Sequence, residues 1–373
     1  MDALTTPLPK AWQKVRLGDI AEINPPTIIP NVFYYIDLES VEKGQLLNKQ
    51  LMTKNKAPSR ARRLLSKNDI LYQLVRPYQR NNYFFTLNGN YVASTGYAQI
   101  RTLQNPSFLY FALLSNYFVN AVLDRCEGTS YPAISSNELK KCEVILPPLN
   151  EQIAIANILS ALDRYLCALD ALILKKESVK KALSFELLSQ RKRLKGFNQA
   201  WQRVRLGDIA NYLTSNLSVE QITQQGKIKV YDVNNFIGYT DTTFISDKPY
   251  ISIVKDGSVG RVRILPPKTN ILSTMGALIA NHRTTTEFLF YLLSNFDFKN
   301  FTSGSIIPHI YFKDYKEKTI FLPPLNEQIA IANILSDLDN EITSLKNKKR
   351  QFENIKKALN HDLMSAKIRV LNK

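Results

Sequence analysis

The segment at residues 57–82 carries side chains suited to binding the phosphates and reading the bases of nucleic acid. Between residues 57 and 82, six arginines and lysines accompany a single acidic residue and alternate with glutamine, asparagine and tyrosine. Arginine and lysine bind phosphate oxygens, and arginine and amide side chains also read base edges. The candidate DNA-binding residues here are Arg60, Arg62, Arg63, Gln73, Arg76, Tyr78, Arg80 and Asn81. A strand hairpin with a solvated basic face is the alternative interpretation.

Further candidates lie in two glycine-containing loops and in the second half of the chain. One loop covers residues 128–131, and the other begins at Gly304. Both precede long predicted helices and could face the groove of a duplex, although a tight turn without contact is the alternative. These candidate DNA-binding residues are Thr129, Ser130, Tyr131, Lys255, Ser258, Arg261, His282, Arg283 and Ser305.

One motif is similar to part of a catalytic site. Asn24-Pro25-Pro26-Thr27 is similar to the Asn-Pro-Pro-aromatic signature with which amino-methylating DNA enzymes hold the target base. Here the fourth residue is threonine, and no glycine-rich loop follows a strand to bind S-adenosylmethionine. The phosphate-binding loop of nucleotide hydrolases is also missing from the sequence. We therefore expect a proline-stiffened turn at this motif and a chain that is not an enzyme.

Composition and charge narrow the class of protein further. The 373 residues are 45% hydrophobic and lack the long apolar run of a membrane span, so we expect a folded cytoplasmic protein with no membrane partner. Cys126, Cys142 and Cys167 lack CxxC spacing, which predicts neither disulfides nor a metal site. The net charge of +17 favours a polyanionic partner such as DNA.

A phrase of identical sequence, LPPLNEQIAIANIL, occurs at residues 146–159 and again at residues 322–335. The prolines end the preceding element, Asn150 and Asn326 are predicted N-caps, and a long helix is expected to follow. Apolar residues then recur in alternating steps of four and three, as in a coiled-coil seam, interrupted in each helix by two lysines. The predicted seam residues are Ile155, Leu159, Leu162, Leu166, Leu169, Ile331, Leu335, Leu338, Ile342 and Leu345, and the interrupting lysines are Lys176, Lys180, Lys349 and Lys356.

The charge of each predicted helix changes sign along its length. Residues 150–174 and 326–345 are acidic overall, whereas residues 175–195 and 346–373 are strongly basic. An antiparallel pair places each acidic half beside a basic half, so we predict antiparallel helices. The alternative is that each helix only complements its own macrodipole. The basic tails hold thirteen of the seventeen net charges, so the excess charge alone does not prove DNA contact.

A second repeated phrase opens each half of the chain. WQKVRLGDIA at residues 12–21 returns as WQRVRLGDIA at residues 201–210, an offset of 189 against 176 for the helices. The segments between opener and helix therefore differ in length by 13 residues, and they share little sequence beyond echoes such as Gly128, Pro132 and Ile134 against Gly304, Pro308 and Ile310. We expect two variable modules with a common fold.

Each module is expected to mix strands and helices. The predicted strands cover residues 70–75, 83–87 and 91–93 in the first module and residues 228–233, 250–254 and 262–265 in the second. The predicted helices cover residues 106–122 and 287–293, the latter with Thr286 as N-cap.

The doubled helix phrase, the doubled opener and the two dissimilar modules together resemble the specificity subunit of type I restriction-modification systems. The resemblance covers nearly the whole chain and includes the phrases YIDLESV at residues 35–41 and SRARR at residues 59–63. It implies an α+β fold with a pseudo-two-fold internal repeat, in which two mixed α/β target recognition domains are joined by two long antiparallel coiled-coil helices. The expected domains are recognition domain 1 at 1–148, spacer helix 1 at 149–195, recognition domain 2 at 196–324 and spacer helix 2 at 325–373.

The resemblance also implies a division of labour. Each recognition domain would read one half of a bipartite, gapped DNA site, and the helices would set the gap and dock two methylation subunits. This chain would hold no cofactor, because the methylation subunits bind S-adenosylmethionine and the restriction subunits, which are ATP-driven translocases, use ATP with magnesium. Individual DNA-reading residues do not carry over, because recognition domains vary within the family.

Two other classes of function remain open from the sequence. A DNA methyltransferase would bind S-adenosylmethionine as the isolated chain. A coiled-coil adaptor without DNA contact would also have duplicated helices, and charge reversal at Arg60, Arg62 and Arg63 would then leave every activity of its complex unchanged.

Overall fold

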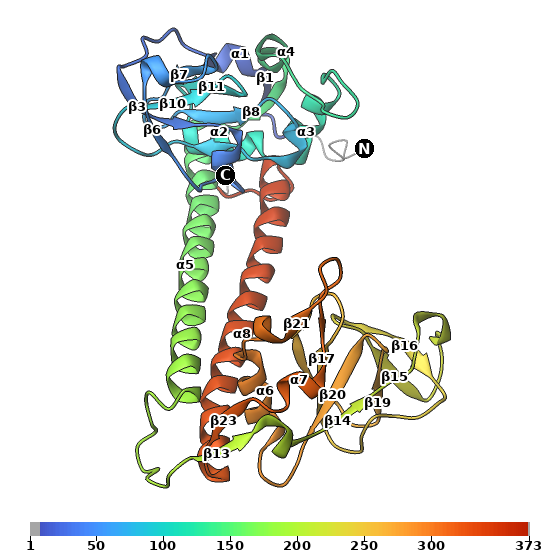
Figure 1. Cartoon of the computed structure of the whole chain (residues 1–373). Coiled ribbons are helices and arrows are strands. Elements are labelled where there is room, and N and C mark those ends of the chain that lie inside the picture. The colour runs from blue at the N-terminus through green and yellow to red at the C-terminus, as the bar shows by residue number, and fades with distance from the viewer. Residues whose placement is uncertain (1–7, 372–373) are drawn as a thin grey trace. The chain divides into compact units, whose positions relative to one another are not determined.

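The structure, a computed structural model, describes residues 8–371, which form two compact units (Figure 1). Unit 1 contains the chain up to Asp170 and again from Lys348, and unit 2 contains Ala171–Asn347. Both boundaries fall within long helices, α5 (Leu149–Leu188) and α8 (Leu325–Met364). Each unit therefore contains the first part of one long helix and the last part of the other.

The two long helices start where the sequence predicts but end earlier than residues 195 and 373. Their N-caps differ from the prediction. The carbonyl oxygen of Pro148 accepts a hydrogen bond from the N–H of Glu151, so Asn150 already lies in the first turn. The prediction of Asn150 and Asn326 as N-caps was wrong, because each helix begins directly after its second proline, whose carbonyl accepts the first helical hydrogen bond.

Within each unit the two helix segments run antiparallel and pair opposite charges. In unit 2, Lys176 lies 2.8 Å from Glu341 and Lys180 lies 2.5 Å from Asp339. Unit 1 repeats the second pair with Lys356 and Asp163, and its Lys349 lies 2.6 Å from Asp170. The antiparallel arrangement predicted from the charge pattern is thus confirmed.

The lysines that interrupt the predicted seam are the same four lysines that form these ion pairs. The ten predicted seam residues are all buried or half-buried, with Ile155, Leu159 and Leu335 fully buried. Leucines and isoleucines therefore fill the contact between the helices, and lysine stems extend from it to acidic partners on the other helix.

Unit 1 contains two four-stranded sheets, a two-stranded ladder and a short hairpin. The sheet that carries much of the candidate site has the order β2-β11-β8-β9 and is antiparallel throughout; the other has the order β6-β3-β10-β7 with a parallel β3–β10 pair. The strands are β1 (Gln13–Arg16), β2 (Ala21–Ile23), β3 (Val32–Ile36), β4 (Val41–Glu42), β5 (Gln45–Leu46), β6 (Gln50–Thr53), β7 (Ala61–Leu64), β8 (Ile70–Gln73), β9 (Tyr83–Phe84), β10 (Tyr91–Ser94), β11 (Tyr97–Thr102) and β12 (Glu143–Leu146). Its shorter helices are α1 (Leu17–Ile20), α2 (Pro106–Leu113), α3 (Asn116–Leu123) and α4 (Ser136–Lys141).

Unit 2 repeats this topology with different residues. Its main sheet has the order β14-β20-β17-β18, which corresponds strand by strand to β2-β11-β8-β9, and its second sheet again contains a parallel pair, β15–β19. The strands are β13 (Gln202–Arg205), β14 (Ala210–Thr214), β15 (Ile228–Tyr231), β16 (Phe236–Thr240), β17 (Tyr250–Val254), β18 (Val262–Leu265), β19 (Thr269–Ile271), β20 (Met275–Ala280), β21 (Thr302–Ser303), β22 (His309–Ile310) and β23 (Thr319–Leu322), and the helices are α6 (Thr286–Ser294) and α7 (Phe312–Tyr315).

The predicted elements are present with two corrections. The predicted helix at residues 106–122 is broken into α2 and α3, because the Ser115 hydroxyl accepts from the Phe118 N–H and starts a new helix. The N-cap of α6 is Thr285 and not Thr286, since it is the Thr285 hydroxyl that accepts from the Phe288 N–H. No single helix among residues 8–371 is long and apolar enough to cross a membrane, and the bent pair α2–α3 meets that test by length and composition alone.

The two repeated phrases meet in space as one ladder. The opener strand β1 pairs with β12, the strand just before α5, and β13 pairs with β23 in the same register, Gln13 opposite Leu146 and Gln202 opposite Leu322. Gly18 and Gly207 follow these strands, and a Cβ at either position would crowd the Cβ and the carbonyl oxygen of Lys140 or Lys316. The two repeated phrases therefore form the same structure in both units, called here the constant base: the ladder β1–β12 in unit 1 and β13–β23 in unit 2. The difference of 13 residues lies in the variable segment between the two strands of each ladder.

A buried carboxylate joins the start of each long helix to this base. Glu327 is fully buried and accepts hydrogen bonds from the indole N–H of Trp201 at 2.9 Å and from the guanidinium of Arg193 at 2.7 Å. In unit 1, Glu151 receives the same bonds from Trp12 and Arg369. Each unit thus has a carboxylate clamp, defined as Glu151 with Trp12 and Arg369 or Glu327 with Trp201 and Arg193.

The following glutamine adds a second link in each unit. The Gln152 side chain donates to the Pro147 carbonyl and accepts from the Asn105 N–H, just before α2. Gln328 donates to the Pro323 carbonyl and accepts from the Thr285 N–H, just before α6. The NEQ segment of the repeated phrase therefore positions the module against the helix.

We predict that Glu327→Gln lowers the free energy of unfolding of unit 2 by about 2 kcal/mol, because the variant leaves the Arg193 guanidinium without its counter-charge in a buried site. The measurement is urea unfolding followed by tryptophan fluorescence in a Trp12→Phe background, where Trp201 alone reports unit 2. As a matched control, Glu341→Gln removes an exposed carboxylate of the same helix and should cost below about 0.5 kcal/mol. Equal effects of the two variants would contradict a clamp role for Glu327.

Candidate nucleic-acid interface

Two basic segments of unit 1 come together at one edge through backbone hydrogen bonds. The N–H of Thr95 donates to the Arg60 carbonyl at 2.8 Å, and the N–H of Leu74 donates to the Gly96 carbonyl at 2.9 Å. The turn at residues 94–96 therefore lies between the segment that carries Arg60 and the loop that begins after β8. The sequence separates these segments, and the sheet places them side by side.

The loop after β8 is held by its own polar side chains. Gln73 is 3% exposed, donates to the Gln79 side chain and accepts from the Asn81 N–H. Arg80 donates to the Leu114 carbonyl at 3.0 Å, and burial lowers its pKa from the usual value. Gln73 and Arg80, two of the candidate DNA-binding residues, thus use their side chains to fix the loop, Gln73 from a buried position and Arg80 from a half-buried one.

Other predicted residues of unit 1 remain accessible. Arg62 and Tyr78 are exposed, and Arg60 is exposed with a pKa raised by its hydrogen bond to the Tyr35 hydroxyl. The guanidinium of Arg76 lies 4.1 Å from the centre of the Tyr131 ring.

The second predicted loop of unit 1 is attached to the same edge. The Arg76 N–H donates to the Pro132 carbonyl at 2.7 Å, and Val75 forms an isolated bridge with Ala133. Thr129, Ser130 and Tyr131 are all exposed on this loop. Asn81 is half-buried, and its side-chain oxygen accepts from the Lys43 N–H.

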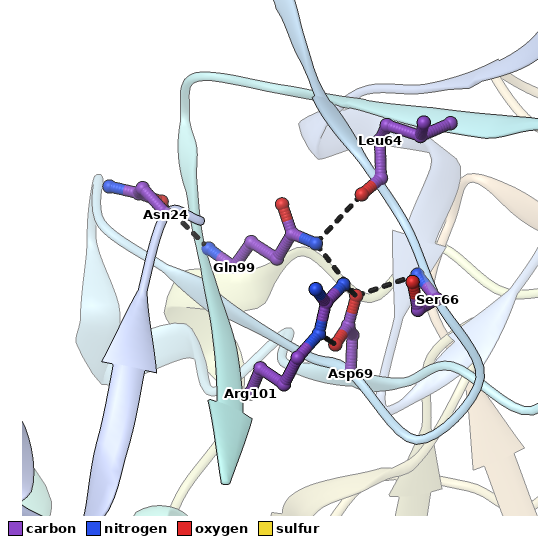
Figure 2. Close-up of polar contacts among 6 residues, drawn as sticks. All are labelled: Asn24, Leu64, Ser66, Asp69, Gln99 and Arg101. Atoms are coloured by element: carbon purple, nitrogen blue, oxygen red, sulfur yellow. Dashed lines mark hydrogen bonds and ion pairs between the residues drawn. The ribbon is translucent and has the colours of Figure 1, made fainter. Parts of the chain in front are cut away.

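A buried polar network links the start of β8 to β11 and to the end of β7 (Figure 2). The Asp69 carboxylate accepts from the Ser66 N–H, the Gln99 amide and the Arg101 guanidinium at 2.7–2.9 Å. Gln99 also donates to the Leu64 carbonyl at the end of β7. Because Asp69 and Gln99 are fully buried, these bonds join the two four-stranded sheets rigidly.

The same network explains the Asn-Pro-Pro motif. The Asn24 side chain accepts from the Gln99 N–H at 3.0 Å and donates to the Ser136 hydroxyl at 2.9 Å, so both of its polar atoms are used (Figure 2 shows the first bond). Its backbone has a positive φ of 57°, as in a tight turn. The motif thus forms a structural turn.

Arg63 occupies a different position from its neighbours. It is half-buried beside a hollow of about 460 Å³ that the Asn-Pro-Pro turn, Lys54 and Arg62 also line. Burial, and to a lesser extent the charge of Arg62, lower the pKa of Arg63. Lys54 was not among the predicted residues, because it lies outside the dense arginine run.

In unit 2 only part of the predicted set comes together. The loop after β17 carries Lys255 and Ser258, and Arg261 follows it with its guanidinium bonded to the Asn234 side chain at 2.9 Å. The loop containing Ser305 is joined to the same place, because the Gly257 N–H donates to the Pro308 carbonyl at 2.9 Å. Lys255, Ser258, Arg261 and Ser305 therefore share one edge, the counterpart of the edge in unit 1.

His282 and Arg283 lie at the opposite end of the sheet. The register places Val254 opposite Met275 at the first residue of β20, whereas His282 follows its last residue. The Arg283 carbonyl accepts from Gln328, and its guanidinium donates to Gln202. Strand β20 therefore separates these two candidate residues from Lys255 by roughly 17 Å.

The two edges are built alike. In unit 1 the Ile134 N–H donates to the Leu74 carbonyl, and in unit 2 the Ile310 N–H donates to the Lys255 carbonyl. The faint Gly-Pro-Ile echo in the sequence therefore marks one shared loop contact. Among residues 8–371, no cluster of three histidine, cysteine or acidic residues could hold a metal ion.

Comparison with known proteins gives the family. The model of the "Type I restriction modification DNA specificity domain" matches residues 9–177 and 198–354, one match in each half. The type I restriction enzyme MjaVIII specificity subunit of Methanocaldococcus jannaschii is 24% identical over 98% of this chain and 95% of its own length. The putative MjaX specificity subunit of the same organism is 31% identical over 64% of this chain and 62% of its own length. Such subunits are the non-catalytic members of their complexes.

Solved structures agree on the fold. The S subunit of a type I restriction-modification system from M. genitalium has a TM-score of 0.64 at 20% identity, covering 97% of this chain and 99% of that one. A chain from a study of assembly of the type I R-M system has a TM-score of 0.61 at 21% identity, covering 96% and 99%. Together with the two family matches, these findings show that the chain belongs to the type I restriction-modification specificity subunit family.

Proposed function

We propose that each unit of this chain reads one half of a bipartite, gapped DNA site for a type I restriction-modification complex. The observation that carries the proposal is the matched pair of basic loop edges, one in each unit, on the same strand topology but with different side chains. Because the two edges occupy the same position on the same topology, they suit a common task, which is contact with duplex DNA. Unequal side chains suit two different half-sites.

The chemistry of the edges suits this task. Arg60, Arg62 and Arg76 in unit 1, and Lys255 and Arg261 in unit 2, would bind phosphates and fix the register of the protein on the duplex. Ser130, Tyr131, Ser258 and Ser305 would lie near base edges, where hydroxyls donate and accept hydrogen bonds. The clamped helices hold the two edges and so would set the gap between half-sites.

Docking of two methylation subunits is supported by the repeated phrase itself. Its buried residues are explained by packing, but Leu149 and Ile153 of unit 1 and their repeats Leu325 and Ile329 of unit 2 are between 43% and 54% exposed. An identical exposed apolar pair in both repeats suits one kind of partner that binds twice. We assign this face to the methylation subunits, which would supply S-adenosylmethionine.

The rest of the assembly follows from the same proposal. Restriction subunits with ATP and magnesium would act on DNA that this chain has selected, in the cytoplasm. A methyltransferase function for this chain itself is disfavoured by Asn24, whose side-chain atoms are both engaged within the protein.

We predict that Arg60→Ala with Arg62→Ala weakens DNA binding of the complex and makes it less dependent on salt. Each phosphate ion pair that the double variant removes should make the slope of log affinity against log salt shallower by about 0.9. The measurement is titration of labelled duplex at several salt concentrations. Arg16→Ala, an exposed arginine on the constant β1 strand, is the matched control. An unchanged slope in the double variant, with complex formation intact, would favour the adaptor function.

We also predict that Ile153→Asp and Ile329→Asp each remove one bound methylation subunit, and that the double variant removes both, because a buried charge replaces an apolar contact. Stoichiometry is measured by light scattering of the assembled complex. Leu174→Asp is the control: Leu174 is 65% exposed on α5, but its counterpart in the repeat is Arg350, so it is not part of a duplicated face. Full stoichiometry in the double variant would refute the assignment of this face.

A further inference from the structure

The hairpin formed by β21 and β22 in unit 2 is a preorganised loop. Thr302 pairs with Ile310 and Ser303 with His309, and the turn between them starts at Gly304 with a φ of +92°. A Cβ at Gly304 would collide with the carbonyl oxygen of Ile307, so the turn requires glycine. The hairpin tip is therefore shaped before any partner binds.

The hairpin is also fixed to the basic edge. The Ile310 N–H donates to the Lys255 carbonyl, and the His309 ring lies 2.7 Å from the Asp256 carboxylate. These bonds hold the tip beside Lys255 and Ser258, the residues assigned to DNA contact. The position of the tip is thus set by the same loop that would bind the backbone of the duplex.

The tip itself is apolar. Ile306 is 92% exposed and Ile307 is 55% exposed. A single exposed isoleucine is ordinary on a protein surface. Two adjacent isoleucines on an anchored tip, at the edge assigned to DNA, would suit an apolar group within a polar ligand.

We propose that Ile306 and Ile307 read thymine by contact with its C5 methyl group in the major groove. The thymine methyl is the apolar group that base edges present there, and apolar side chains recognise it. The inference rests on the proposed DNA-binding function and deepens it by naming the base.

The equivalent loop of unit 1 supports a reading role. It is fixed by equivalent bonds to the edge but presents Ser130 and Tyr131, with hydroxyl groups, in place of two isoleucines. One loop position thus carries different recognition chemistry in the two modules, as two different half-sites require.

The test uses the complex with methylation subunits and a duplex selected by the wild-type complex from a random pool. Each thymine of the site is replaced in turn by deoxyuridine, which lacks the C5 methyl. For the wild type we expect affinity to fall about four-fold per contacted methyl, at one or two positions confined to one half-site. In the Ile306→Ala, Ile307→Ala variant, the same replacements should have no effect.

Two controls separate the outcomes. Ile355→Ala removes an exposed isoleucine of α8, and Tyr131→Ala alters the loop of unit 1; both should keep the deoxyuridine effect. The proposal is overturned if wild type and the double variant respond equally to deoxyuridine, if no thymine matters, or if the variant weakens binding to both duplexes alike, as an apolar wedge between base steps would. Failure of the wild type to select any sequence would instead refute the proposed function.

Discussion

The carboxylate clamps are the contacts on which the rest of the structure depends. Burying Glu151 and Glu327 is unfavourable unless each carboxylate is fully paired, and in each unit the opener tryptophan and an arginine beyond the end of the other long helix supply the partners. One carboxylate therefore joins the opener strand, the start of one helix and the chain beyond the end of the other. This requirement explains why the opener tryptophan and the NEQ segment are repeated without change at these positions.

A constant base allows the modules to vary. The β1–β12 and β13–β23 ladders and the helix starts keep their register, while the segments between them differ by 13 residues and in nearly every loop. The same strand order persists with different residues, and the central strands β8 and β17 are buried along their whole length in both units. The loops at the sheet edge carry no such constraint, so their side chains are free to match different half-sites.

Much of this architecture could be predicted from the sequence. The period of the apolar residues indicated the long helices, and the charge reversal indicated their antiparallel pairing, because both depend on residue type alone. The roles of Gln73 and Arg80 could not be predicted, since a polar side chain that fixes a loop and one that faces DNA are identical in sequence. The separation of His282 from Lys255 depends on strand register, and the clamp role of Glu151 depends on Arg369, which lies 218 residues away.

The most direct test of the account is to mix this chain and its methylation subunits with a pool of random-sequence duplexes and to sequence the retained DNA. We expect a two-part motif whose halves are separated by a gap of fixed length and any sequence, because the two separate edges are held on helices of fixed length. Retention without any enriched motif, while the complex remains assembled, would contradict the claim that the two edges select sequence.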